Sequence, residues 1–535
     1  MKRVLGAAAF MALLVAGCGD DGSPPSAAPG DDAGTTAPSS TAAPEECTAE
    51  LAGGTVTFGE YLQPRGLDPA NSSAAAGVYG GSEMLAIYDT LLRYDHDTGE
   101  FVPHVAESLE SNDDATVWTV QLRPGITFGN GDPLTAEAVK GSLERHRDPA
   151  LRSALAGRVG ENTEMRVVDE LTLEFRLAMP WSGFPSLLAG TGGMIVNPKV
   201  AAALGANFSL LPTGAGVGPY EPVAFRPADV IELKAKPDYW GGPVCIEQLR
   251  FVPLSGAELT YESLRQGQLQ AAFIRDPAVV AEARADGQDM FVDTVNLGTT
   301  LALNHMEGRP GNDLRVRRAI AAAVDVDVVN ERVWSGDGLT TSAIIYEDSP
   351  WYDGLEGPEY DPDLARRLVA EVKAAGGLTA PLHFICGTDP ASSRLATTIQ
   401  TMLSAVGIDS NVDTATNNSQ ARLEGNFDIS CHGLNVNNAD PWANLSSQTS
   451  SKAGSRNVFR FFNPAWDAAL EELRAAPTDS EKMAALADLQ EIWNEQIPVL
   501  GISALDETVM HSPELHGVKF GQDAVVYFDD AYLEQ

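Results

Sequence analysis

The chain has 535 residues, of which 44% are hydrophobic and 21% charged, a composition typical of globular proteins. It carries 36 Lys and Arg residues against 74 Asp and Glu residues, for a formal net charge of −38. A chain this acidic repels phosphate backbones and anionic lipid head groups, which argues against nucleic acid as a partner. Its length is too great for one compact core, so we expect two or three domains.

The N-terminus predicts a secretory signal over residues 1–17. Lys2 and Arg3 provide a positive start, and the apolar run 4–16 is too short to span a bilayer. The run ends in LVAGC, which resembles the lipobox of bacterial lipoproteins, where cleavage precedes the cysteine and the thiol carries a diacylglycerol. We therefore expect lipidation at Cys18 and anchoring at the extracytoplasmic face of the bacterial cell membrane. The alternative is a plain signal peptide with an incidental thiol.

Residues 18–47 predict a lipid-anchored flexible linker. After the cysteine they consist almost wholly of Gly, Ser, Pro, Ala, Thr and Asp, with no aromatic and no large aliphatic residue. Such a segment cannot bury enough apolar surface to offset its ordering entropy. The folded part therefore begins near residue 48.

Strand patterns dominate the first half of the folded part. Residues 117–122 (VWTVQL) and 171–177 (LTLEFRL) alternate apolar and polar side chains, and 230–235 (VIELKA) does so more weakly. This alternation predicts sheets with one solvated face, and hence antiparallel or edge strands.

Helical patterns become more frequent in the second half. Residues 362–377 repeat apolar side chains at four-residue steps up to Gly376, and 480–496 present one apolar face. A strand–helix–strand run over 382–414, with Gly407 at its turn, predicts a parallel unit. Mixed sheets covered by helices make the protein α/β.

Four cysteines remain beyond the lipobox, and they suggest two disulfides outside the cytoplasm. Cys47 and Cys245 each precede a strand-like run, whereas Cys386 and Cys431 each close one. Of the three possible pairings we favour Cys47–Cys245 and Cys386–Cys431. Neither these cysteines nor the scattered histidines have metal-ligand spacing, so we expect no metal and no cofactor.

Catalytic signatures are absent from the sequence. It has no nucleophile elbow, no zinc-protease motif, no Walker loop and no C-x-x-C. GAGVGP, residues 214–219, resembles a dinucleotide loop only superficially, and DHDTGE, residues 95–100, is better explained as a hairpin turn than as a calcium loop.

Five segments, in the same order, resemble the family 5 extracellular solute-binding proteins, the peptide, nickel and opine receptors of ABC importers. The longest runs over 87–149, and the others are 216–220, 237–242, 264–273 and 301–329. The longest segment also makes local sense, because it combines a turn, a strand containing Trp118 and a helix opened by Thr135.

The resemblance implies a type II periplasmic-binding-protein fold, with two hinged lobes and an extra inserted domain. Domain I would comprise 48–90, 215–300 and 505–535, domain II would be an insertion over 91–214, and domain III would span 301–504. The ligand would lie in the cleft between domains I and III, and the chain crossings near Thr300 and Ala504 would form the hinge.

The resemblance also implies transport rather than catalysis. We expect a monomer, not an enzyme, that captures a small solute and delivers it to ABC permease and ATPase subunits. A lipid anchor would raise its effective concentration beside them. Two alternatives are a secreted lipoprotein hydrolase with catalytic carboxylates unseen in the sequence, and a sensor or adhesion subunit that reuses the binding fold.

Family peptide receptors carry a Trp and, three residues later, an Asp that pairs with the α-ammonium of the ligand. Alignment on Asp440-Pro441 puts Leu434 at the Trp position and Asn437 at the Asp position, with Asn435 between them. An amide offers no counter-charge to a buried ammonium. We therefore expect weak binding of unmodified dipeptides, and ligands such as an oligopeptide-like solute with a blocked amine, an oligosaccharide or another polar metabolite.

Two further stretches are expected at the cleft by position in the family. Tyr61 and Gln63 follow the first strand and are predicted ligand contacts. Gly193 and Met194 are predicted to bring backbone amides and a thioether near the ligand, although Met194 is more often a core residue. Asp440 is expected to cap a helix that has Pro441 in its first turn.

Overall fold

The structure is a computed structural model that describes residues 47–48, 51–71, 76–96, 98–153, 155–159, 163–414 and 418–534. These residues belong to one compact unit that begins at Pro44. The predicted signal 1–17, Cys18 and the predicted linker up to residue 46 lie outside the described residues. Among the described helices, none combines the length and apolar character needed to cross a bilayer.

A ten-stranded mixed sheet forms the centre of the fold, in the order β14-β13-β15-β12-β16-β11-β1-β10-β9-β8. Parallel pairs join β1 to β10 and β13 to β14, and antiparallel pairs join β12 to β16 and β9 to β10. The strands are β1 (Thr55–Glu60), β8 (Tyr220–Arg226), β9 (Val230–Ala235), β10 (Gln248–Pro253), β11 (Ala271–Ile274), β12 (Met290–Leu303), β13 (Leu382–Cys386), β14 (Ser410–Thr414), β15 (Ile429–His432) and β16 (Val499–His511).

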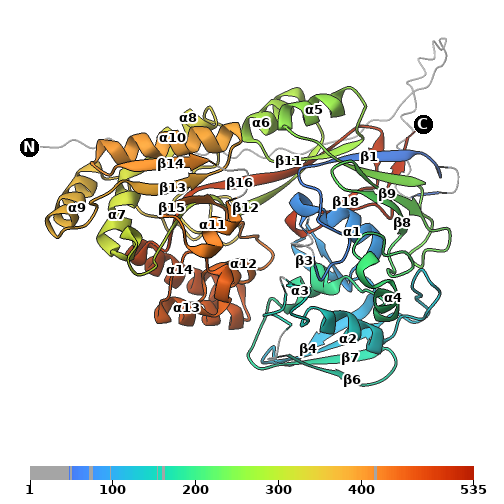
Figure 1. Ribbon diagram of the computed structural model, residues 1–535. Coiled ribbons are helices and arrows are strands. Elements are labelled where there is room, and N and C mark those ends of the chain that lie inside the picture. The colour runs from blue at the N-terminus through green and yellow to red at the C-terminus, as the bar shows by residue number, and fades with distance from the viewer. Residues whose placement is uncertain are drawn as a thin grey trace, which may run out of the picture. The chain divides into compact units, whose positions relative to one another are not determined.

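The two long strands β12 and β16 connect the two ends of this sheet (Figure 1). They pair from Met290 opposite Met510 to Ala302 opposite Val499, with a register shift between Val295 and Thr299. Irregular pairing of this kind bends a strand. The predicted crossings near Thr300 and Ala504 lie on these strands, and their role as a hinge stays a prediction.

A smaller antiparallel sheet has the order β4-β5-β7-β6. The predicted strands 117–122 and 171–177 are confirmed as β5 and β7, and their side chains alternate between buried and more exposed positions. The remaining strands are β2 (Leu92–Asp95), β3 (Glu100–Pro103), β4 (Ala106–Ser111), β5 (Val117–Leu122), β6 (Thr163–Val167), β7 (Thr172–Leu177), β17 (Leu515–His516), β18 (Lys519–Phe520), β19 (Val526–Tyr527) and β20 (Tyr532–Leu533).

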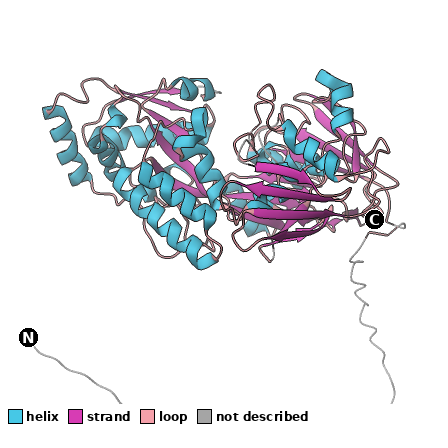
Figure 2. Cartoon of the chain, turned by 90° about the horizontal axis from the view of Figure 1, so that it is seen from below, coloured by secondary structure: helices cyan, strands magenta, loops and turns pink. Residues whose placement is uncertain are grey.

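Helices cover the large sheet most densely at its β13–β15 end (Figure 2). The predicted parallel unit is confirmed there, because β13 and β14 pair directly in parallel and α10 connects them in the sequence. The helices are α1 (Gly81–Tyr88), α2 (Ala136–Arg145), α3 (Phe184–Ala189), α4 (Pro198–Leu204), α5 (Ala257–Arg265), α6 (Pro277–Asp286), α7 (Leu314–Ala323), α8 (Val326–Val333), α9 (Pro362–Ala374), α10 (Pro390–Ala405), α11 (Ser419–Glu424), α12 (Pro441–Thr449), α13 (Pro464–Ala475) and α14 (Asp479–Gln496).

Local signals in the sequence set several of these helix ends. Thr135 caps α2, because its side chain accepts a hydrogen bond from the Ala138 amide at 3.3 Å. Gly376, just beyond α9, has a φ of +85°, which a residue without Cβ adopts at no steric cost. The predicted start of α2 and the predicted stop after α9 are both confirmed.

Both predicted disulfides are present. Cys47 pairs with Cys245, with Cα atoms 5.7 Å apart, and Cys386 pairs with Cys431, with Cα atoms 4.9 Å apart. The second bond joins β13 to the adjacent strand β15. Each therefore links segments that are distant in sequence but adjacent in the fold.

Apolar side chains gather in several separate cores. One surrounds the smaller sheet and draws its members from residues 91–217. A second joins residues 56–88, 194–273 and 509–531, and two more lie within 297–502. The division into domains I, II and III stays a prediction.

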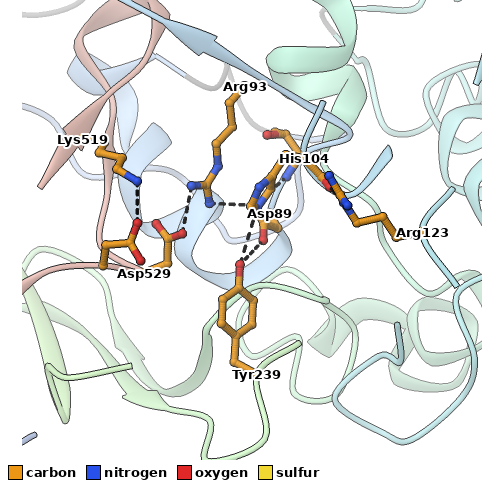
Figure 3. Close-up of polar contacts among 9 residues, drawn as sticks. Asp89, Arg93, His104, Arg123, Tyr239, Lys519 and Asp529 are labelled. Carbon is orange, nitrogen blue, oxygen red and sulfur yellow. Dashed lines mark hydrogen bonds and ion pairs between the residues drawn. The ribbon is translucent and has the colours of Figure 1, made fainter. Parts of the chain in front are cut away.

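A buried polar network holds the C-terminal segment against the end of α1 (Figure 3). Asp89 forms ion pairs with His104 at 2.7 Å and with Arg93 at 3.2 Å, and it accepts a hydrogen bond from the Tyr239 hydroxyl at 2.6 Å. Arg93 also pairs with Asp529 at 2.9 Å. Burial opposes ionisation of Asp89, but the His104 and Arg93 charges together hold its pKa well below its usual value.

The GAGVGP stretch is structural. A Cβ added to Gly216 would lie 2.0 Å from the Ile87 carbonyl oxygen, and one added to Gly218 would lie 2.5 Å from that of Ala86. These glycines let the chain entering β8 pass directly against α1. That close approach explains a glycine pattern that resembles a nucleotide loop.

Candidate functional site

A cleft of about 480 Å³ opens among segments that are far apart in sequence. Its lining comes chiefly from residues 76–79, 155–191, 419–458 and 507–523, and we call this surface the cleft. On one side stand α11 and α12, and on the other stands α3 (Figure 1). The lining thus draws on β12, β15 and β16 of the large sheet, on the three helices just named, and on the loop that precedes β6.

Leu434, Asn435 and Asn437 all lie in the cleft lining, on the loop between β15 and α12. Leu434 is 1% exposed and packs in a core, so little of its surface is open to the cleft. Asn435 has a φ of +49°, and its buried Oδ1 has no hydrogen-bond partner among the described residues. An unpaired buried acceptor is a position from which a ligand donor would gain a hydrogen bond.

Asn437 is already bonded at both ends of its amide. Its Nδ2 donates to Asp523 Oδ1 at 2.8 Å, and its Oδ1 accepts from the Asp440 amide at 3.0 Å. Asp523 lines the cleft as well, so a carboxylate stands beside the amide. The sequence prediction missed it, because the stretch around Asp523 carries no recognisable motif.

Burial raises the pKa of Asp523 to about 6, and the nearby Asp293 carboxylate adds to the rise. Asp293 is itself buried, and its Oδ2 accepts from the Ala524 amide at 3.2 Å. Two carboxylates therefore lie close together behind Asn437. At neutral pH Asp523 still carries most of its negative charge.

The side chain of Asp440 does not cap α12, which corrects the sequence prediction. Asp440 occupies the N-cap position and Pro441 begins the helix, but the carboxylate makes no cap hydrogen bond. Its Oδ2 instead accepts from Trp181 Nε1 at 3.2 Å and from Ser186 Oγ at 3.1 Å. Asp440 thus ties α12 to the segment that leads into α3.

Cationic side chains line the cleft together with these carboxylates. Arg158 donates to the Ala443 carbonyl at 2.7 Å, and Arg422 donates to the Cys431 carbonyl at 3.4 Å. Arg456 is exposed at the end of the 3₁₀ segment Ser451–Arg456. His432 faces Gln448 at 3.0 Å, and burial, with the charge of Arg422, lowers its pKa to about 4, so its ring is neutral at pH 7.

Tyr61, Gln63, Gly193 and Met194 do not lie in the cleft lining, in contrast to the prediction. Tyr61 is 48% exposed beneath Arg275, and Gln63 Oε1 accepts from the Ala228 amide at 2.6 Å. Met194 is 1% exposed within a core, and a Cβ added to Gly193 would meet the Leu188 carbonyl oxygen at 1.7 Å. Steric confinement of the backbone explains the glycine, and the neighbouring residues 190 and 191 reach the cleft instead.

Apolar side chains complete the lining. Tyr79 and Leu423, which are 38% and 45% exposed, belong to it, and so do Val78 and Leu155. The described residues contain no cluster of three or more His, Cys, Asp or Glu side chains that could hold a metal ion. The arrangement suits a solute with both polar and apolar parts.

Comparison with known proteins is consistent with this geometry. The chain is 26% identical over 468 residues to the di/tripeptide-binding protein 2 of Pseudomonas aeruginosa, a match that covers 82% of this chain and 87% of the relative. It is 23% identical to the dipeptide-binding protein of Escherichia coli, with 84% of this chain and 89% of the relative covered.

Solved structures share the fold. The periplasmic binding protein DppA of Helicobacter pylori, solved with the peptide STSA, superposes with a TM-score of 0.79 at 22% identity and covers 91% of this chain and 99% of its own. NikZ of Campylobacter jejuni, solved with Ni(L-His), gives 0.74 at 19% identity, with 89% and 99% covered. The type II periplasmic-binding-protein fold is thereby confirmed.

A family model matches residues 100–456, which is most of the folded part. The model describes the middle region of family 5 of the bacterial extracellular solute-binding proteins. The segments from which the resemblance was inferred fall largely within or beside this range. The chain belongs to the family 5 bacterial extracellular solute-binding proteins.

Proposed function

We propose that the protein captures a peptide-like or other polar solute in the cleft and delivers it to the permease and ATPase of an ABC importer. The cleft carries the proposal, since its mixed polar and apolar lining is drawn from segments that are far apart in the sequence. The names of the relatives, a di/tripeptide-binding protein and a dipeptide-binding protein, support a peptide-like ligand. In this proposal the protein binds and releases its solute without chemical change.

The proposed location is the outer face of the cell membrane, with acyl chains on Cys18 as the anchor. The LVAGC sequence supports this, and so does the presence of two disulfides, which persist in oxidising compartments. A tethered monomer would stay near its permease.

The proposed ligand contacts are Leu434, Asn435 and Asn437. Asn435 offers an acceptor without a partner, whereas the Asn437 amide is held by Asp523 and the Asp440 backbone. The family carboxylate is missing at position 437, and the Asp523 carboxylate beside it already accepts a hydrogen bond from the Asn437 amide. We therefore propose that the solute lacks a free α-amine or binds with that amine outside the cleft.

The test is titration calorimetry with tetrapeptides that differ only in N-acetylation. We expect the wild-type protein to bind the acetylated peptide at least as tightly as the free one. Asn437→Asp should shift the preference toward the free peptide by about tenfold, because a second carboxylate favours an ammonium. Asn411→Asp, on exposed β14, is the matched control and should leave the preference unchanged.

Micromolar binding of free dipeptides by the wild type, unaffected by acetylation or by the substitution at 437, would contradict the amine proposal. Native mass spectrometry of the purified protein tests the function more broadly, since a bound solute should co-purify intact. Turnover of that solute would favour the hydrolase alternative instead.

A further inference from the structure

The cleft is lined by several positively charged side chains, although the protein as a whole is strongly acidic. The chain as a whole has a net charge of −38, yet three arginines line this one cleft: Arg158, Arg422 and Arg456. Arg158 and Arg422 are half-buried there, and removing an arginine charge from water is costly unless a carboxylate compensates it. The cluster therefore calls for an explanation by function.

Arg158 and Arg422 form hydrogen bonds to backbone carbonyls and not to carboxylates. Within the described part of the chain, neither guanidinium makes an ion pair, and the contacts are those to Ala443 and Cys431, with Ser419 at 3.5 Å from Arg422. Burial lowers the pKa of both guanidinium groups. Their positive charges are therefore less stable in the cleft than in water. An anion would supply the missing compensation.

The carboxylates of the cleft are partly engaged or neutralised. Burial raises the pKa of Glu507 to about 8, so it holds a proton at pH 7, and it already faces Arg275 at 3.4 Å. Asp440 accepts hydrogen bonds from Trp181 and Ser186, and Asp523 accepts one from Asn437. Neither Asp440 nor Asp523 forms an ion pair with Arg158 or Arg422 in the described lining, because their oxygens accept from other groups.

The arginines also come from segments that are far apart in the sequence. Arg158 comes from the segment between α2 and β6, and Arg456 comes from the segment after α12. Burial disfavours the charged form of Arg158, and the Arg456 charge adds to this by repulsion, whereas the Asp440 and Asp523 carboxylates favour the charged form. A bound anion would turn that repulsion into attraction toward a common partner.

We propose that the solute is anionic, with a carboxylate or phosphate group that Arg158 and Arg422 bind by charge-assisted hydrogen bonds. This inference rests on the proposed function, because it names the class of solute for the same cleft. It agrees with the missing carboxylate at position 437, since an amide there removes one negative charge that would repel an anion. Acidic peptides and phosphorylated solutes share this chemistry.

The test compares blocked peptides of equal length by titration calorimetry. The probes are acetyl-Ala-Glu-Glu-Ala-amide, acetyl-Ala-Gln-Gln-Ala-amide and a phosphoserine counterpart. We expect the anionic peptides to bind at least about tenfold more tightly than the neutral one, and the better of the two identifies the carboxylate or the phosphate source. Arg158→Gln and Arg422→Gln should each remove most of this preference for the anionic peptides over the neutral one.

Arg176→Gln is the matched control, because Arg176 is an exposed arginine on β7 paired with Glu174, outside the cleft. It should leave every affinity unchanged. Equal binding of acidic and neutral peptides by the wild type, or an unchanged preference in both cleft variants, would overturn the proposal.

A second measurement separates this proposal from the peptide function. Thermal unfolding is followed in citrate, phosphate and chloride at equal ionic strength, for the wild type and the cleft variants. If no peptide binds but citrate or phosphate raises Tm only when both cleft arginines are present, the peptide function fails and the anion site stands. If the variants respond to the anions as the wild type does, the anion site fails, whatever the peptides do.

Discussion

At the scale of single residues, Glu60 and Glu83 are two buried carboxyl groups outside the cleft that interact with each other. They are 3% and 1% exposed, and neither carboxyl group forms an ion pair with a basic side chain among the described residues. Burial raises the pKa of both groups, that of Glu83 to about 7, and the charge of Glu83 adds to the rise at Glu60. At least one of these carboxyls is therefore protonated in the folded protein at neutral pH.

We predict that Glu83→Gln stabilises the protein above pH 7 and has little effect near pH 4.5. The folded pKa lies above the unfolded value of about 4.5, so between these values the folded state holds a proton that the unfolded state has lost. Wild-type stability therefore falls as pH rises through this window. The amide cannot ionise, and we expect a gain of about 2 kcal/mol at pH 8.

Denaturant unfolding across pH 4.5 to 8 checks this expectation. Glu137→Gln, at an exposed position in the first turn of α2, is the matched control. A gain that does not grow with pH would show that Glu83 is not protonated on folding.

At the scale of elements, the Asp440 carboxylate joins α12 to α3 and to the segment before it. Asp440 accepts from both Trp181 and Ser186, and Arg474 stacks on the rings of Trp181 and Trp442 at 5.6 and 5.0 Å. A cap would stabilise only its own helix, whereas this contact couples two elements. Ser186 and Asp440 also belong to the cleft lining.

We predict that Asp440→Ala destabilises the protein by about 2 kcal/mol, because it leaves two buried donors without an acceptor. In a double-mutant cycle, Asp440→Ala and Ser186→Ala should show a coupling free energy of about 1 kcal/mol. Ser447→Ala, within α12, is the control and should add independently. Additivity in both cycles would mean that Asp440 acts on α12 alone.

The sequence predicted these elements well where the signal was local. Alternation in 117–122 and the glycine after α9 act over a few residues, so β5 and the end of α9 were predictable. Asp440 was misread because Asp-Pro before a helix is a common cap pattern, and only packing brings Trp181 within reach of its carboxylate. The Asp-Pro pattern predicted the start of α12 correctly, but it predicted the wrong role for the Asp440 side chain.

At the scale of the whole molecule, the prediction concerns anchoring. Cys18→Ala should give an unlipidated product that is no longer retained in the membrane fraction, because acyl chains provide the proposed attachment. Mass spectrometry of the mature N-terminus should find a diacylglycerol on the wild-type cysteine. Ser23→Ala, in the predicted linker, is the control and should stay membrane-bound. A wild-type protein without that added mass would refute the lipobox interpretation.

The sequence by itself determined the family, the α/β class, both disulfide pairings and the presence of Leu434, Asn435 and Asn437 at the cleft. These features could be predicted because ordered motifs and alternating side chains are local signals, each complete within a short stretch of sequence. Only the tertiary structure decided the electrostatics of the cleft. Asn437 meets Asp523 across 86 residues of sequence, and Arg158 meets Ala443 across 285. Such contacts follow from how whole segments pack, which no local pattern records, and they set the charge that a solute meets.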